Sequence, residues 1–327
     1  IKKIYAKEVL HTSQSDIDKK RNLIANTDYS LGPGDTIFLD FQGVAIFSRN
    51  YSIDRNGELY LPEIGKITAG NKTLEELKNK SKKALVAYLV AGDPDIETTL
   101  ELMTVLVESG VDIIEIGVPF TDPIAEGPII QKAHDRALKN NVSLKSIFEM
   151  VDKFRENDDD TPLVLMGYLN TFIFNKALIE DNKNDVIDSV LVVDIPGELK
   201  LKDYGVYNPN INTISLISPT TKKDRIGSIA KNSSGFVYYV TLRGVTGASN
   251  LDVNEISSNI EEIKKHASVP TLAGFGIKSA EDAKLLSQCS DGVIIGSSIV
   301  QMIEESSQSK EFDRIRTYIT DIKKAIS

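Results

Sequence analysis

The chain has 327 residues, of which 41% are hydrophobic, and a formal net charge of −9. This length fits one large α/β domain with a small additional unit. The negative charge and the lack of a long basic run argue against nucleic-acid binding, because phosphate backbones attract stripes of Lys and Arg. The single cysteine, Cys289, excludes an intramolecular disulfide framework, and we expect it to be a buried structural thiol.

Residues 1–27 are polar with weak helical periodicity, which predicts a tail or an exposed helix. In residues 29–41, a Gly-Pro-Gly-Asp turn precedes an alternating apolar strand. In residues 51–65, the Asn56–Gly57 pair between apolar residues predicts a β-hairpin.

A capping box follows, with Thr73 three residues before Glu76, and it predicts a helix over 73–83. Residues 28–81 are therefore predicted to form a small β-rich unit with a closing helix. The remaining residues, 82–327, have a different pattern.

Short, continuously apolar runs alternate with helical stretches from about Ala84 onward, and helix caps are predicted at Asp95 and Ser279. Runs of this kind are typical of parallel strands buried on both faces. There are eight: 84–90, 111–116, 162–168, 188–193, 212–217, 235–240, 269–274 and 291–296. Eight strand–helix repeats over roughly 240 residues predict an α/β fold of the TIM (β/α)8 barrel type. A doubly wound open sheet is the alternative, although it seldom has eight such regular units.

Two late loops are rich in glycine. Gly274 and Gly276 follow the seventh predicted strand, and Gly296 and Ser297 lead from the eighth strand into a helix. A third such loop spans 243–250. Each loop alone could be a simple turn. Glycines and helix N-termini after strands seven and eight together predict a phosphate site.

The segment EIGVPFTDPIAEGP (115–128) carries three carboxylates, Glu115, Asp122 and Glu126. It could be an ordinary solvated loop. However, Glu115 lies at the mouth end of a buried strand, where desolvation raises the pKa of a carboxyl and suits it to proton transfer. A second carboxylate on the following loop could then serve a different role.

The three histidines, His11, His134 and His266, lack metal-ligand spacing, so we interpret them as ordinary surface or helix residues and expect no metal site. No apolar run approaches the ~20 residues of a membrane span, and no signal peptide opens the chain. These features favour a cytoplasmic protein that contacts no membrane.

Six stretches carry a resemblance to a known family: VAYLVAGDPDIETTLELM, GVDIIEIGVPFTDPIAEGPIIQKAHDRAL, TPLVLMGYLN, GFVYYVTLRGVTGA, AGFGI and DGVIIGSSIVQMI. Together they closely resemble the tryptophan synthase α subunit over about residues 82–327. The resemblance implies a TIM barrel that cleaves indole-3-glycerol phosphate to indole and glyceraldehyde 3-phosphate. It also implies an α2β2 complex, in which the β subunit carries pyridoxal phosphate and this chain holds no cofactor.

The resemblance assigns roles to individual residues. Glu115 matches the catalytic acid/base, and Glu126 matches the second carboxylate, which contacts the indole N–H. Tyr238 matches a tyrosine beside the catalytic glutamate, and Thr246 matches the threonine of a loop that closes over the site. The matching phosphate positions are Gly247, Gly276, Gly296 and Ser297, and those of the β-subunit interface are Pro119, Asp122 and Asn170.

The chain departs from the family at the second carboxylate, because the family has the sequence ADGP where this chain has AEGP. Glu126 keeps the charge but is one methylene longer, and a displacement of about 1 Å can cost ~100-fold in rate. We therefore expect reduced or repositioned activity. In addition, residues 174–190 are shorter than the family's segment, and residues 197–213 lack a clear amphipathic helix.

The N-terminal stretches YSLGPGDTIFLDFQG and YSIDRNGELYLPEIGKITAGNKTLEELKNK resemble the N-terminal part of polysaccharide export proteins, which sit in the bacterial envelope. The lack of a signal peptide and of a lipid-anchor cysteine argues against export of this chain. Three functions follow: a lyase acting as an α subunit, a barrel that only binds a β subunit, and an envelope interaction protein with a passenger barrel.

Overall fold

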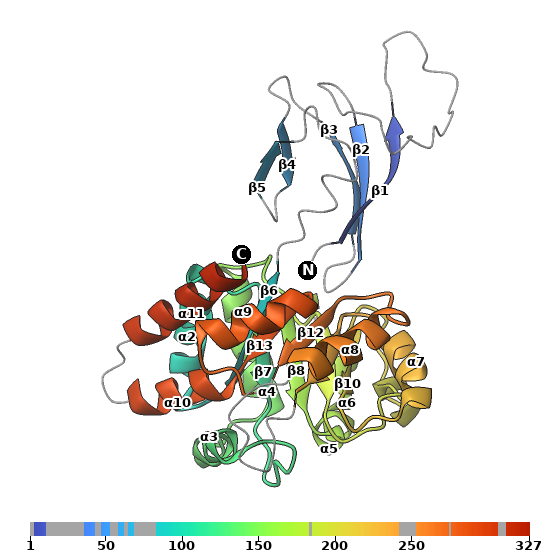
Figure 1. The fold of residues 1–327 in the computed structure, drawn as a ribbon. Coiled ribbons are helices and arrows are strands. Elements are labelled where there is room, and N and C mark those ends of the chain that lie inside the picture. Colours follow the sequence, from blue (N-terminus) through green and yellow to red (C-terminus); the bar gives the residue numbers. More distant parts are fainter. Residues whose placement is uncertain are drawn as a thin grey trace. The chain divides into compact units, whose positions relative to one another are not determined.

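A computed structural model of the chain is shown in Figure 1. It describes residues 83–182, 185–241, 253–274, 276–306 and 312–327 in full, and the backbone of five N-terminal strands. The chain divides into two compact units, residues 1–82 and 83–327. Among the described residues, no helix combines the length and apolar content needed to cross a bilayer.

The N-terminal unit contains two small antiparallel sheets. One has the order β1–β2–β3, and the other pairs β4 with β5; the strands are β1 (Lys3–Leu10), β2 (Thr36–Gln42), β3 (Phe47–Ser52), β4 (Glu58–Leu61) and β5 (Gly65–Thr68). Strand β2 confirms the predicted alternating strand. The helix predicted over 73–83 falls mostly on residues 69–82, which lie outside the described residues.

Two predictions for this unit were wrong. Residues 3–10 form strand β1, which pairs with β2, and not a polar tail. Strand β3 pairs with β2, while β4 pairs with β5, so the Asn56–Gly57 pair does not join two paired strands. In both cases the partner strand decides the pairing, because strand preference depends on cross-strand neighbours more than on local sequence.

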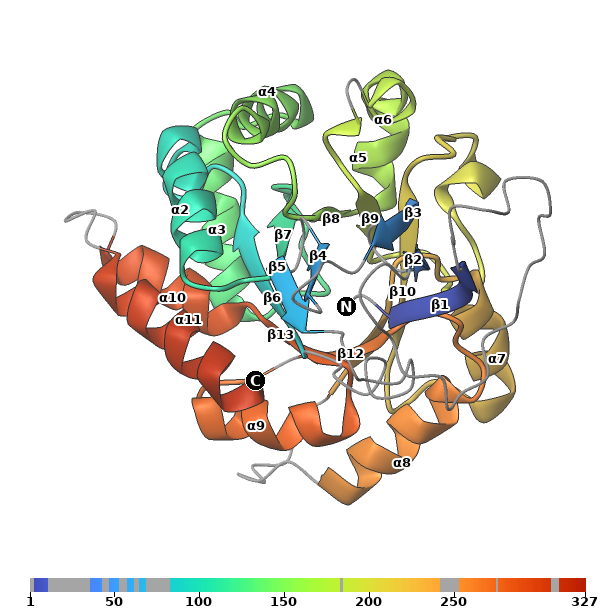
Figure 2. The same cartoon turned by 90° about the horizontal axis from the view of Figure 1, so that it is seen from above.

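Residues 83–327 form a closed barrel of eight parallel strands, surrounded by helices (Figure 2). The strands are β6 (Ala84–Val90), β7 (Ile113–Gly117), β8 (Leu163–Gly167), β9 (Ser189–Val192), β10 (Asn212–Ile217), β11 (Val237–Val240), β12 (Thr271–Gly274) and β13 (Gly292–Ile295). Closure occurs where β13 pairs with β6. The predicted TIM barrel is thereby confirmed, and the open-sheet alternative was wrong.

The helices follow the strands in the expected alternation. They are α2 (Ile96–Glu108), α3 (Pro128–Lys139), α4 (Leu144–Arg155), α5 (Leu169–Phe174), α6 (Lys176–Asp181), α7 (Lys223–Asn232), α8 (Val253–Lys264), α9 (Ala280–Cys289), α10 (Ser297–Ser306) and α11 (Asp313–Ile326). The caps predicted at Asp95 and Ser279 are present. Between β9 and β10 only a short 3-10 helix, η2 (Leu201–Tyr204), occurs, as the lack of an amphipathic pattern predicted.

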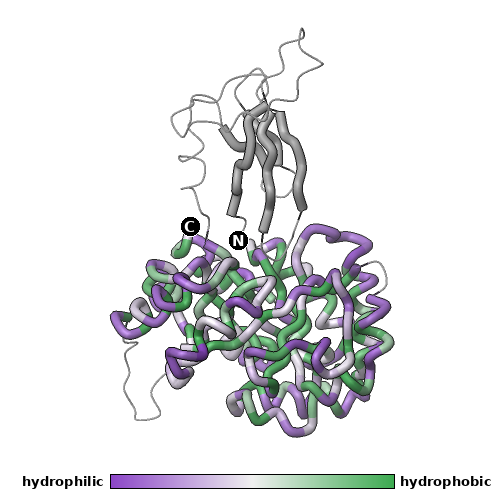
Figure 3. Tube along the Cα trace, turned by 90° about the vertical axis from the view of Figure 1, so that its right-hand side faces the viewer, coloured by the Kyte–Doolittle hydropathy of each residue, from purple (hydrophilic) through white to green (hydrophobic). Residues whose placement is uncertain are grey.

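The strands are apolar throughout because both of their faces are buried. Leu85, Ala87 and Leu89 of β6 belong to the large core cluster that the surrounding helices share, whereas Tyr88 and Val90 belong to a second, smaller cluster. Figure 3 shows the resulting pattern, in which apolar segments lie inside and polar segments outside. Complete burial of a Leu or Ile side chain contributes about 1.5–3 kcal/mol, so these two layers supply much of the stability.

One polar arrangement recurs four times at the beginning of the strands. In each case a residue just before one strand donates its N–H to the carbonyl of a residue on the preceding strand. The side chain of the first residue accepts the N–H of the second. The pairs are Asp112 with Leu85, Asp188 with Leu163, Ser234 with Thr213, and Asp291 with Thr271. The barrel is thus built of four strand pairs, each joined at its start by the same reciprocal exchange.

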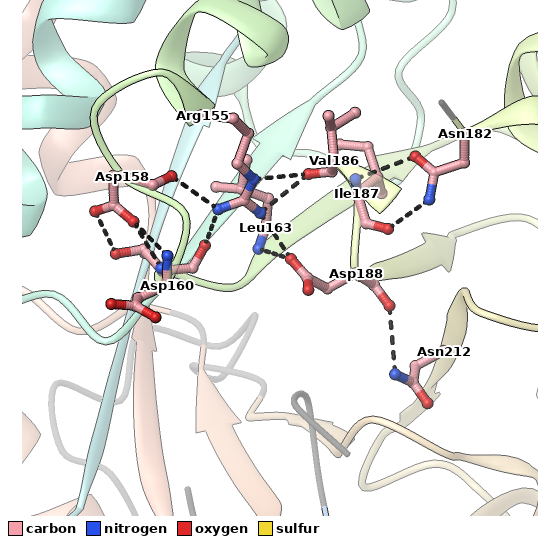
Figure 4. Close-up of polar contacts among 10 residues, drawn as sticks. Arg155, Asp158, Asp160, Leu163, Asn182, Val186, Ile187, Asp188 and Asn212 are labelled. Carbon is pink, nitrogen blue, oxygen red and sulfur yellow. Dashed lines mark hydrogen bonds and ion pairs between the residues drawn. The ribbon is translucent and has the colours of Figure 1, made fainter. Parts of the chain in front are cut away.

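In three of these pairs a helix supplies a cation to the aspartate: Lys323 to Asp112, Arg155 to Asp188 and Lys264 to Asp291. Figure 4 shows the second pair. The Arg155 side chain is 10% exposed; it donates to Asp188 Oδ2 at 2.9 Å and to the carbonyls of Val186 and Thr161. This aspartate therefore ties helix α4 to strands β8 and β9.

We predict that Asp188→Ala lowers the free energy of unfolding by about 3 kcal/mol, because it removes the anionic partner of a largely buried guanidinium and leaves the Leu163 N–H without its acceptor. Asp188→Asn should cost less, since its amide oxygen can still accept from Leu163. Urea denaturation measures both. Glu149→Ala on the same helix is the control, because Glu149 and Lys145 are exposed and their ion pair contributes at most ~0.5 kcal/mol. Equal losses for Asp188→Ala and Glu149→Ala would contradict the prediction.

Candidate active site

Glu115 lies inside the barrel on β7, in register with Tyr88 of β6 and Val164 of β8. Its side chain is 1% exposed, and no described residue donates a hydrogen bond to its Oε1. Burial, and secondarily the charge of Glu126, raises the pKa of Glu115 to about 8. At neutral pH the side chain is therefore predominantly a carboxylic acid, able to give up a proton.

Glu126 lies on the loop between β7 and α3, and its carboxylate is held by a tyrosine. Tyr168, at the end of β8, donates its hydroxyl hydrogen to Glu126 Oε2 and accepts the Ala125 N–H at 3.0 Å. The Tyr168 ring also stacks on Phe120 of the same loop, with ring centroids 4.5 Å apart. The sequence did not reveal this contact; its only signal was a tyrosine directly after an apolar run.

The two carboxyls have different environments, and these separate their roles. Burial raises the pKa of Glu126 as well, but the hydrogen bond from Tyr168 counteracts the shift by stabilising the charged form. Glu115 is almost completely buried, and no described residue donates to its Oε1. The two environments therefore differ: that of Glu115 favours the protonated acid, whereas the Tyr168 hydrogen bond favours the charged form of Glu126.

Tyr238 on β11 has its hydroxyl oxygen 2.8 Å from where a Cβ on Gly274 of β12 would be. Burial and then the charge of Glu115 raise the pKa of this hydroxyl well above its ordinary value. The hydroxyl therefore stays protonated. Thr246 and Gly247 lie within residues 242–250, which are outside the described residues.

Three of the four predicted phosphate residues, Gly276, Gly296 and Ser297, lie on two loops that are bonded to each other. Gly276 has a φ of +71°, a conformation that favours glycine, and the neighbouring Ile277 carbonyl accepts a hydrogen bond from Ser298 Oγ at 3.0 Å. That bond joins the loop after β12 to the first turn of α10, which begins at Ser297 directly after Gly296. Two glycine-containing loops and one helix N-terminus thus meet at the mouth of the barrel.

The residues assigned to a partner interface differ in exposure. Asp122 and Asn170 are exposed, whereas Pro119 is buried beneath the loop. Two large apolar side chains lie close to them in sequence and are also exposed, Ile124 at 84% and Phe174 at 81%.

His134 does not behave as the ordinary helix residue that the sequence predicted. It is 2% exposed, and its ring contacts the β7–α3 loop and Tyr88. His266 is only partly buried and lies against Glu262, and His11 is outside the described residues. Within the described residues, no group of three or more His, Cys, Asp or Glu side chains could hold a metal ion.

The described site can now be compared with known proteins. The family of tryptophan synthase alpha chains matches residues 74–327. The chain belongs to this family. It is 45% identical over 252 residues to the tryptophan synthase alpha chain of Neisseria meningitidis serogroup B, covering 75% of this chain and 94% of that one. It is 43% identical over 257 residues to that of Janthinobacterium, covering 78% and 97%.

Solved structures agree with this assignment. The tryptophan synthase α subunit of Legionella pneumophila matches with a TM-score of 0.69 at 35% identity, covering 77% of this chain and 96% of that one. A chain of the tryptophan synthase α2β2 complex of Pyrococcus furiosus matches with a TM-score of 0.66 at 33% identity, covering 74% and 98%. As a tryptophan synthase α chain, the protein is a lyase of tryptophan biosynthesis.

A second family, described as polysaccharide biosynthesis/export protein, matches residues 24–101. The two matches share residues 74–101, which include β6 and the beginning of α2. The resemblance of the N-terminal unit to export proteins is therefore confirmed, alongside that of the barrel to the α chains.

The raised pKa of Glu115 predicts a pH-dependent stability. Because the folded chain binds this proton more tightly than the unfolded chain, the stability it contributes is complete below pH ~4.5 and is lost as the pH rises through about 8. Glu115→Gln is neutral at every pH, so it should be more stable than the parent at pH 9 by at least ~1 kcal/mol, but not at pH 4.5. Thermal unfolding across this range measures the difference. A difference that does not change with pH would contradict the assignment, and Glu149→Gln serves as the exposed control.

Proposed function

We propose that the barrel cleaves indole-3-glycerol phosphate to indole and glyceraldehyde 3-phosphate, with Glu115 as the general acid and base. The observation that carries this proposal is a fully buried, protonated Glu115 beside a second carboxylate at the mouth of the barrel. Proton transfer by such a group contributes typically 10²–10⁴-fold to a rate.

The reaction needs one proton to enter and one to leave. Glu115 gives its proton to C3 of the indole ring, which generates a cation delocalised to the ring nitrogen. The resulting Glu115 carboxylate then takes the proton of the adjacent glycerol hydroxyl as the carbon–carbon bond breaks. The bond electrons return to the ring, so indole and the aldehyde are released and Glu115 is protonated again.

Glu126 is the group that stabilises the cation, through the indole N–H. The Tyr168 hydrogen bond favours the charged form of this carboxyl, and electrostatic stabilisation of this kind acts mainly on the transition state. Tyr238 lies beside Glu115 inside the barrel, and Thr246 completes the proposed set on the loop after β11.

The substrate phosphate is proposed to bind at Gly247, Gly276, Gly296 and Ser297. The joined loops after β12 and β13 support this, because backbone N–H groups and the N-terminus of α10 favour an anion. The positive φ of Gly276 lets the backbone turn closely there. The chain itself needs no cofactor for this chemistry.

We further propose that a β subunit carrying pyridoxal phosphate docks on the loop face that includes Asp122 and Asn170, giving an α2β2 complex in the cytoplasm. The exposed Ile124 and Phe174, which follow Asp122 and Asn170 closely in sequence, support this, because large exposed apolar side chains often belong to interaction surfaces. Pro119 is buried, so it would hold the start of this loop in place and would not contact the partner directly.

The export-family match favours a second candidate, in which the unit of about residues 28–81 binds an envelope component and the barrel is a passenger. Fractionation of the native host separates the candidates, since the lyase is expected in the cytoplasmic fraction. A barrel that only activates a β subunit is distinguished by its failure to release indole by itself.

The central test is Glu115→Gln. Because Gln is nearly isosteric but cannot transfer a proton, we expect indole release to fall about 10³-fold, with the fold intact. Indole release from indole-3-glycerol phosphate is measured with and without a β subunit. Glu149→Gln, far along helix α4, should keep the parent rate. Comparable rates for Glu115→Gln and the parent would refute the role of Glu115.

The longer second carboxylate leads to a separate prediction. Glu126→Asp should raise kcat, because the family's spacing otherwise fits the shorter acid and Tyr168 now holds the longer one to the loop. The expected gain is on the order of 10-fold, with a smaller change in KM. Steady-state kinetics with the same β subunit decide it. A variant no faster than the parent would mean that the Tyr168 contact already accommodates Glu126.

A further inference from the structure

His134 is a buried histidine to which the proposed chemistry assigns no role. It projects from helix α3 and makes two contacts with its two ring nitrogens. Its Nδ1 accepts the Phe120 N–H at 3.0 Å, and its Nε2 lies 3.5 Å from the Tyr88 hydroxyl oxygen. These contacts reach the loop of Glu126 on one side and the strand beside Glu115 on the other.

The contact with Phe120 determines which atom donates in the contact with Tyr88. A backbone N–H can only donate, so His134 Nδ1 carries no hydrogen. Burial lowers the pKa of His134 to about 4, so the ring is neutral at pH 7 and its one hydrogen is on Nε2. Nε2 therefore donates to the Tyr88 oxygen, and the hydroxyl hydrogen of Tyr88 points away from His134.

Tyr88 occupies the interior of the barrel mouth. It is in register with Glu115, and its hydroxyl oxygen lies only 2.3 Å from where a Cβ on Gly117 would be. Its own Cβ lies 3.3 Å from where one on Gly296 would be. The tyrosine thus fits between the strand that carries Glu115 and the loop that enters α10. Besides burial, the charges of Glu126 and Glu115 raise the pKa of its hydroxyl, so the hydrogen stays in place near both carboxyls.

The second contact of His134 leads to Glu126. Phe120, whose N–H it accepts, stacks on Tyr168, and Tyr168 donates to Glu126. His134 therefore contacts Tyr88, the strand partner of Glu115, on one side, and begins a chain of contacts through Phe120 and Tyr168 to Glu126 on the other.

We propose that His134 is a positioning residue for the cleavage, which orients the Tyr88 hydroxyl as a donor toward the substrate at Glu115 and fixes the loop that carries Glu126. This inference rests on the proposed function. His134 touches neither carboxylate. Its contact gives the Tyr88 hydroxyl a direction that a tyrosine alone would not have.

Helix α3 has an anchor that does not depend on His134. Arg136 makes two hydrogen bonds to the buried Asp93, at 2.7 and 2.8 Å, and an ion pair with Glu304 of α10. Substitutions at His134 should therefore leave the helix in place, which makes their effects on turnover interpretable.

The test compares substitutions that preserve one contact at a time in the full chain. His134→Asn offers an oxygen near Nδ1 for the Phe120 N–H but no donor near Nε2. His134→Gln places an amide group near Nε2, and Tyr88→Phe removes only the hydroxyl. The matched control is His266→Asn, which changes a partly exposed histidine on the other side of the barrel wall.

Indole release from indole-3-glycerol phosphate gives kcat and KM, and thermal unfolding gives the Tm. We expect His134→Asn and Tyr88→Phe each to lower kcat about 10-fold with KM changed less than ~2-fold, the effect of one lost hydrogen bond. The double variant should also lose about 10-fold and not ~100-fold, because both changes remove the same contact. His134→Gln keeps a donor for Tyr88 but loses the acceptor of the Phe120 N–H, so we expect kcat to fall only about 3-fold, the contribution of the loop contact.

An unchanged kcat in Tyr88→Phe, or losses that multiply in the double variant, overturns the proposal. If His134→Asn fails to fold, Tyr88→Phe and His134→Gln decide it by the same criteria. Failure of the proposed function gives a different result. If the parent releases no indole, or if Glu115→Gln releases it as fast as the parent, both the proposed function and the role of His134 are overturned. A parent that is active and dependent on Glu115, with Tyr88→Phe and His134→Asn at the parent rate, overturns only the role of His134.

Discussion

The barrel depends on a reciprocal pair of hydrogen bonds that joins neighbouring strands at their start. One partner is a polar residue that lies just before a strand, and the other lies near the start of the previous strand in the chain. Asp112, Asp188, Ser234 and Asp291 each accept an N–H with the side chain and return their own to the same residue. Three of the four also recruit a cation from a helix. The exchange fixes the stagger of the strands, and it places the charged groups that support the fold at the beginning of the strands.

The opposite end of the barrel is thereby free to carry groups that would be costly elsewhere. Glu115 is buried with one oxygen that receives no hydrogen bond from any described residue, which disfavours its charged form and raises its pKa. Asp188 is also largely buried, but it has Arg155 and the Leu163 N–H as donors. A carboxyl thus supports stability at one end of the strands, and a carboxyl at the other end is an acid with a raised pKa.

At the mouth of the barrel, the described contacts of the Glu126 carboxyl are with a neutral group. Glu126 is held by a phenol, and that phenol stacks on Phe120, whose backbone is in turn bonded to a neutral histidine. A neutral donor stabilises the charged form of a carboxylate without placing an opposite charge beside it. A guanidinium in the place of Tyr168 would neutralise that charge.

The sequence by itself determined the eight strands, most of the helices that follow them, and the place of Glu115. The reason is that buried parallel strands and helix caps depend on local, periodic patterns of residues. It also indicated that no amphipathic helix lies between β9 and β10. Only the tertiary structure decided that residues 3–10 pair with β2, that β4 pairs with β5 and not with β3, and that Tyr168 holds Glu126. It alone decided that His134 is buried between Phe120 and Tyr88. The physical reason is that each of these contacts joins residues whose partners lie on other elements, and the strength of a pairing or a hydrogen bond depends on the partner that folding brings to it.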